Sequence, residues 1–110
     1  MSVGNRQYMR IIVFFDLPTK TKKNKRNYVQ FRRFLLNDGY DMIQFSVYSR
    51  IIVGKDAKMA HYDRIKRNLP PEGSIRCMTV TEKQYSEIEI LVGKRTIQEE
   101  RIGGVQLLLF

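Results

Sequence analysis

Asp16 is the residue whose type and position most suggest chemistry. It follows the five apolar residues 11–15 and comes just before Pro18, so it stands at the end of a predicted strand. A carboxylate beside so much apolar sequence is costly unless it is paired, exposed or bound to a metal ion. Magnesium can be held by one or two carboxylates together with water and substrate phosphate. Two interpretations stay open here: an aspartate that merely forms a turn, or a metal ligand that acts with a second copy of the chain.

Basic side chains crowd the segment that follows Asp16. They are Lys20, Lys22, Lys23, Lys25, Arg26, Arg32 and Arg33. Over the whole chain, 20 lysines and arginines stand against 11 acids, which gives a formal net charge of +9. Such a balance is typical of proteins with an anionic partner, most often nucleic acid. Because cations at a helix N-terminus add to its free N–H groups in binding phosphate, these seven residues are the predicted nucleic-acid surface. The alternative is a solvated helix face.

Other common catalytic arrangements are missing from the sequence. The single histidine, His61, has no serine or cysteine motif beside it, so it is predicted to be structural or on the surface. The single cysteine, Cys77, excludes an intramolecular disulfide and a cysteine zinc site. No apolar run is long enough to span a bilayer. We therefore expect a cytoplasmic protein without a membrane partner.

Hydrophobic patterning predicts the elements that position these residues. Residues 8–15 are expected to form a central strand, because both of its faces are apolar. Residues 22–38 have the three- and four-residue apolar spacing of a helix. Thr19 and Thr21 are candidate caps at its start, and Gly39 lies where a helix commonly stops.

The second half of the chain predicts further short elements. Residues 42–53 are expected to form two strands with a tight bend near Ser46. A second helix is predicted over residues 56–69, capped by the aspartate with which it begins. Residues 74–81 predict a strand, and residues 87–92 predict one more.

The predicted order is strand, helix, strand, strand, helix, strand, with an extra C-terminal strand. This is the α+β, ferredoxin-like βαββαβ pattern, an antiparallel sheet with two helices on one face. Residues 1–93 would form this domain, and residues 94–110 a tail that docks on a second subunit or a partner. The apolar second face of the first strand would need cover, which a sheet-to-sheet homodimer would supply.

Three segments of the chain together resemble the CRISPR-associated protein 2 family. They are residues 9–19 (MRIIVFFDLPT), the basic helix that follows, and residues 44–48 (QFSVY). The order of elements agrees with the family over nearly the whole chain. The Phe-Asp-Leu-Pro-Thr motif and the long basic helix are similar to those of the branch found in type II CRISPR systems.

The resemblance implies a homodimer that binds double-stranded DNA and bridges dimers of the CRISPR integrase while new spacers are acquired. It also implies a metal-dependent endonuclease that acts on RNA or double-stranded DNA, with Asp16 as the catalytic residue and Mg²⁺ ligand. The family's nucleic-acid contacts match residues 20–33 by region. Residues 102–110 would contact the integrase or the second subunit.

Two rival functions remain on the same fold. One is a stand-alone, toxin-like ribonuclease, and the other is a non-catalytic RNA-binding module. The apolar tail bears on the choice, because three leucines and a phenylalanine at residues 107–110 would be a liability if exposed. It therefore favours a docking partner and the bridging role.

Overall fold

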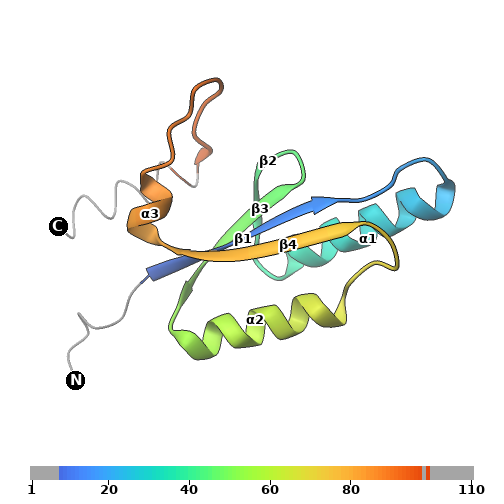
Figure 1. Ribbon diagram of the computed structural model, residues 1–110, viewed down its shortest axis with the longest axis horizontal. Coiled ribbons are helices and arrows are strands. Elements are labelled where there is room, and N and C mark those ends of the chain that lie inside the picture. The colour runs from blue at the N-terminus through green and yellow to red at the C-terminus, as the bar shows by residue number, and fades with distance from the viewer. Residues whose placement is uncertain (1–7, 98, 100–110) are drawn as a thin grey trace.

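The computed structural model describes residues 8–97 and residue 99 of the chain (Figure 1). Its elements are β1 (Tyr8–Asp16), α1 (Lys22–Asn37), β2 (Asp41–Gln44), β3 (Val47–Val53), α2 (Lys55–Arg67), β4 (Ser74–Thr81) and α3 (Glu82–Ser86). The predicted α+β, ferredoxin-like βαββαβ order is confirmed. No helix among these residues is long and apolar enough to cross a membrane. The apolar residues 102–110 lie outside the described part.

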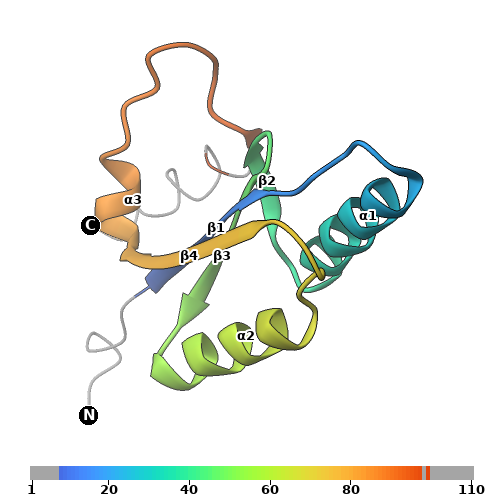
Figure 2. The same ribbon diagram turned by 45° about the vertical axis from the view of Figure 1, so that its right-hand side comes forward.

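The four strands form one antiparallel sheet in the order β2-β3-β1-β4. As predicted, β1 is central, and it pairs with β3 on one side and with β4 on the other. Helices α1 and α2 cover one face of the sheet, and α3 lies on the opposite side, beyond the end of β4 (Figures 1 and 2).

Strand alternation divides the side chains of β1 between the two faces of the sheet. The core on the helical side is built from Ile11, Val13 and Phe15 of β1 with Phe31, Leu35, Tyr48, Ile52 and Ile65 of neighbouring elements. Burying each large apolar side chain stabilises the fold by about 1.5–3 kcal/mol. Ile12, Phe14 and Asp16 point to the opposite face, which we call the second face.

Local sequence signals explain where α1 begins and ends. The hydroxyl of Thr21 accepts a hydrogen bond from the backbone amide of Asn24 at 3.0 Å, and the side chain of Asn24 accepts one from the amide of Thr21 at 3.3 Å. This reciprocal pair satisfies two backbone donors at the helix start. At the other end, Gly39 takes a positive φ of 91°, and the amide of Tyr40 donates to the carbonyl oxygen of Leu35.

The prediction that Asp56 caps the second helix was wrong. α2 begins at Lys55, after Gly54, whose φ of 90° turns the chain into the helix. Asp56 therefore lies within the first helical turn and does not cap it. Its negative charge in the first turn still stabilises the helix, because it interacts favourably with the helix dipole at the N-terminus.

The extra strand expected over residues 87–92 is also corrected by the structure. The chain leaves β4 through α3, which is capped by Thr81, and residues 87–96 form neither helix nor strand. The alternation of Ile88 and Ile90 produced the expectation, but both side chains are exposed. A strand needs a neighbour for its backbone groups, and no strand among the described residues pairs with this segment.

Candidate functional site

Asp16 is the last residue of β1 and lies on the second face of the sheet. It is exposed and stands opposite Ser74, the first residue of β4. Gly73 allows this close approach, because a Cβ atom there would lie 2.8 Å from the backbone oxygen of Asp16. The turn before β4 therefore brings two strand ends together around the carboxylate.

The surroundings of Asp16 on the second face are apolar and basic. Phe14 lies between Val47 of β3 and Arg76 of β4, and Met78, two residues further along β4, is 46% exposed. Arg76 is the diagonal cross-strand neighbour of Asp16, a separation that a long side chain can span. None of the ion pairs in the described part of the chain involves Asp16, so its carboxylate is available to a ligand.

A metal ion at Asp16 would need ligands from outside a single chain. Within residues 8–97 and 99, no group of three or more histidine, cysteine, aspartate or glutamate side chains could hold a metal ion. Magnesium accepts a site with one or two carboxylates when water and substrate phosphate complete its octahedron. Asp16 is therefore a suitable magnesium ligand if water and substrate phosphate supply the remaining oxygens.

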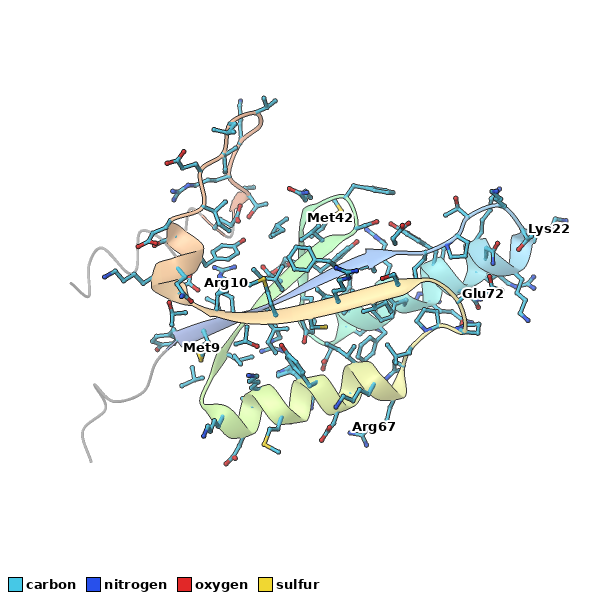
Figure 3. All side chains as sticks on the ribbon, in the orientation of Figure 1. Met9, Arg10, Lys22, Met42, Arg67 and Glu72 are labelled. Carbon is cyan, nitrogen blue, oxygen red and sulfur yellow. The ribbon has the colours of Figure 1, made fainter. Side chains whose placement is uncertain are left out.

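The predicted nucleic-acid residues form an exposed basic surface along α1 and the loop before it. Every member is exposed, and none forms an ion pair in the part of the chain that the structure describes. Figure 3 shows Lys22 at the far end of α1, beyond the sheet. The basic surface thus extends from the loop after β1 along α1.

Sequence reasoning missed a buried charge on the second face. Arg10 is only 3% exposed, and its Nε donates to Glu82 Oε2 at 2.8 Å. Its guanidinium lies 4.0 Å from the ring centroid of Tyr85 and also donates to Ser49 Oγ at 3.3 Å. These contacts hold α3 over the first half of β1 and leave the half that ends in Asp16 uncovered.

The same network reaches the start of the C-terminal tail. The hydroxyl of Tyr85 donates a hydrogen bond to Glu99, whose other carboxylate oxygen accepts from the backbone amide of Thr96 at 2.9 Å. Burial raises the pKa of Tyr85 to about 12, so this phenol remains a donor. The alternation of β1 offers a signal for the network, because it places Arg10 on the apolar face of Ile12, where a charge needs a partner.

His61 belongs to a network between α1 and α2, in agreement with the predicted structural role. Its Nδ1 lies 3.1 Å from Asp38 Oδ2, and Arg64 Nε donates to the other oxygen of Asp38 at 2.9 Å. Arg50 donates to the backbone oxygen of Asp38 at 2.6 Å. Burial, followed by the charge of Arg50, lowers the pKa of His61. The network fastens the end of α1 to α2.

Comparisons with known proteins give matches over most of the chain. A family model described as "CRISPR associated protein Cas2" matches residues 9–88. A protein of Acidovorax ebreus named "CRISPR-associated endoribonuclease Cas2" is 56% identical over 102 residues, which cover 93% of this chain and 100% of that protein. Proteins of the same name are 45% identical in Treponema denticola, over 78% of this chain and 85% of the relative, and in Streptococcus mutans, over 79% and 80%.

Proposed function

This chain belongs to the CRISPR-associated Cas2 family, and on that premise we propose that it is a homodimeric, metal-dependent endonuclease and an adaptor of spacer acquisition. As an endonuclease it hydrolyses phosphodiester bonds of RNA or double-stranded DNA. As an adaptor it binds duplex DNA and bridges dimers of the CRISPR integrase. The names of its relatives support the first role, and its basic surface supports the second.

One observation carries the proposal: Asp16 lies on a sheet face that is only half covered. α3 closes the part around Arg10, while Phe14 and Met78 remain partly exposed beside Asp16. Aligned packing of two such faces is a common way to bury them, and a two-fold axis would bring the same patch of both copies together. Two Asp16 carboxylates would then share one interface.

The chemistry follows from the residues that this interface would gather. Asp16 of both subunits would hold the magnesium ion, which when bound supplies an activated water and stabilises negative charge on the scissile phosphate. Arg76 lies within reach of the same position and would bind a non-bridging phosphate oxygen. The basic surface would orient the rest of the backbone by its phosphates.

The adaptor role depends on different parts of the chain. Bridging needs a dimer, an exposed basic surface and a docking segment, but it does not need Asp16. We assign docking to residues 94–110, which follow the domain of residues 1–93. The bond between Tyr85 and Glu99 anchors the start of this tail to α3.

A stand-alone ribonuclease is the second candidate, favoured by the names of the relatives. It differs from the adaptor in needing no integrase. A third, non-catalytic RNA-binding module would need only the basic surface. All three share the fold, so partner capture and cleavage must be measured separately.

The first test measures mass and cleavage on the same sample. Light scattering should give the mass of a dimer, and cleavage of single-stranded RNA or duplex DNA should require Mg²⁺ and stop in EDTA. A monomer, or cleavage that continues in EDTA, would contradict the endonuclease proposal.

The second test measures docking on the integrase of the same CRISPR locus. Deletion of residues 103–110 should reduce co-purification with the integrase while the dimer mass stays unchanged. Full retention of the integrase by the truncated chain would contradict the assignment of the tail.

A further inference from the structure

Phe45 is the most exposed aromatic side chain in the described part of the chain, at 79%. It occupies the two-residue tip of the hairpin between β2 and β3, together with Ser46. Ser46 has a positive φ of 62°, a conformation that non-glycine residues seldom adopt. A large apolar ring is thus held outside the core at a defined turn.

The ring of Phe45 is held in place from one side. It stacks on Tyr28 of α1 with ring centroids 6.2 Å apart and an interplanar angle of 21°. Tyr28 in turn packs against the buried Phe15 at 5.7 Å, and its hydroxyl lies 3.4 Å from Ser46 Oγ. One side of Phe45 is therefore supported and much of its surface is open. A ring that is ordered in advance loses little entropy when a flat ligand stacks on it.

The charges near this ring favour a nucleic acid over an apolar protein surface. Lys25 and Arg32 lie three residues before and four residues after Tyr28, so both fall within about 60° of it around the helix axis. Both side chains are exposed, and neither is in an ion pair among the described residues. An aromatic platform flanked by cations is how proteins bind single-stranded nucleic acid, with the base on the ring and phosphates on the cations.

The interior bases of an intact duplex cannot reach such a platform, because both of their faces are already stacked inside the helix. An unpaired base can, in RNA or in a single-stranded DNA end. The second face of the sheet lies on the other side from α1, so a dimer formed through it leaves the stacked pair of Phe45 and Tyr28 accessible.

Phe45 also lies close to the proposed cleavage site along the backbone. The amide of Phe15 donates to the carbonyl oxygen of Ser46 at 3.0 Å, so the neighbours of these two residues, Asp16 and Phe45, flank one hydrogen bond. We propose that Phe45 stacks an unpaired nucleobase and holds a single strand at the end of the sheet where β1 ends in Asp16. The part about Asp16 rests on the proposed function, whereas the stacking interaction does not.

The test is equilibrium binding of labelled, unstructured 12-nucleotide RNA and DNA, with a blunt DNA duplex of equal length as reference. It is done in EDTA with the oligonucleotides checked for integrity, so the result does not depend on cleavage. Phe45→Ala should weaken single-strand binding about 5- to 150-fold and change duplex binding less than about twofold. A larger loss for RNA than for DNA would identify RNA as the preferred source of the base, and equal losses would support both.

Matched variants separate stacking from simple apolar packing. Phe45→Tyr should keep binding within about twofold, whereas Phe45→Leu should weaken binding as much as the alanine variant because it has no π-face. Val29→Ala removes an exposed apolar side chain from α1 and should bind the single strand like the unchanged chain. In addition, the fluorescence of 2-aminopurine placed within the single strand should be quenched by the unchanged protein and quenched less by Phe45→Leu.

Three results would overturn the proposal. Unchanged single-strand binding by Phe45→Ala would remove the ring from recognition. Full binding by Phe45→Leu would reduce the interaction to apolar packing. A change in dimer mass with no change in single-strand binding would make Phe45 part of an interface between copies. If stacking holds but no cleavage occurs with Mg²⁺, the proposed endonuclease alone has failed.

Discussion

The backbone amide of Phe15 donates a hydrogen bond to the carbonyl oxygen of Ser46 at 3.0 Å, and this bond joins the end of β1 to the hairpin tip. Figures 1 and 2 show the loop between β2 and β3 beside the end of β1. The bond links the two parts of the chain to which we assign chemistry and base stacking. It also means that disturbing one strand end should disturb the other.

The partly exposed second face predicts that dimerisation is sensitive to charge. Met78→Glu should raise the dimer dissociation constant about 100-fold or more, because an unpaired charge would be buried at the interface. Leu69→Glu is the matched control, since Leu69 is similarly exposed (51%) but follows the end of α2. Sedimentation or light scattering over a dilution series measures both. Equal effects of the two variants would place the interface elsewhere.

The basic surface predicts that binding to duplex DNA depends on salt and is independent of DNA sequence. Charge reversal of Lys22, Lys23 and Arg26 to glutamate should weaken binding to all sequences alike. The slope of log affinity against log salt should fall by about 0.9 for each phosphate that the variant no longer binds. The control carries the same change in net charge on α2 and α3, with Lys55, Lys66 and Lys83 reversed. An unchanged slope in the first triple variant would show that the footprint lies on another surface.

Gly73 is predicted to be needed for the strand end around Asp16. Gly73→Ala must accept both a positive φ of 105° and a Cβ atom 2.8 Å from the backbone oxygen of Asp16. Gly54→Ala is the control: it has a similar φ of 90°, but no atom lies within 4 Å of the added Cβ. The positive φ alone costs about 1–2 kcal/mol. In urea unfolding, Gly73→Ala should be destabilised by at least about 1 kcal/mol more than the control. Equal destabilisation would mean that the turn relaxes without cost.

The lowered pKa of His61 predicts a loss of stability in mild acid. The charged groups that face this ring are Asp38, Arg50 and Arg64, and the Tyr40 ring packs on it. Because the folded pKa lies below the unfolded value, the stabilisation is complete above about pH 6.5, the usual pKa of histidine, and is lost as pH falls through the folded pKa. The free energy of unfolding should therefore drop as the pH falls below about 6.5.

His61→Gln is the control for this effect, because His61 is the only histidine of the chain. This variant should show a shallower dependence on pH in the same range. An equally steep dependence would assign the effect to carboxylates elsewhere.

Much of the fold could be predicted because its signals are local. The two apolar faces of residues 8–15 indicated a central strand, Thr21 and Gly39 marked the ends of a helix, and the bend at Ser46 separated two strands. The strand at residues 87–92 could not be judged locally, since alternation indicates a strand only where another strand is available. The described residues offer none there.

The candidate site could be predicted only in part. The position of Asp16 at the end of β1 could be predicted because a strand end is visible in sequence. Arg76 was not, because its place near Asp16 depends on the register of β4 against β1. Arg10 and Glu82 are 72 positions apart, and no local pattern pairs them. Side chains brought together by strand pairing remain invisible until the sheet is known.

The most direct test of the central claim is the rate of magnesium-dependent cleavage by Asp16→Asn. Asp63→Asn on α2 is the matched control, because it makes the same change in charge on an exposed helix position. We predict that Asp16→Asn cleaves at least about 100-fold more slowly, while its dimer mass and duplex binding equal those of the control. Cleavage by Asp16→Asn at the rate of Asp63→Asn would contradict the assignment of Asp16 as the metal-binding catalytic residue.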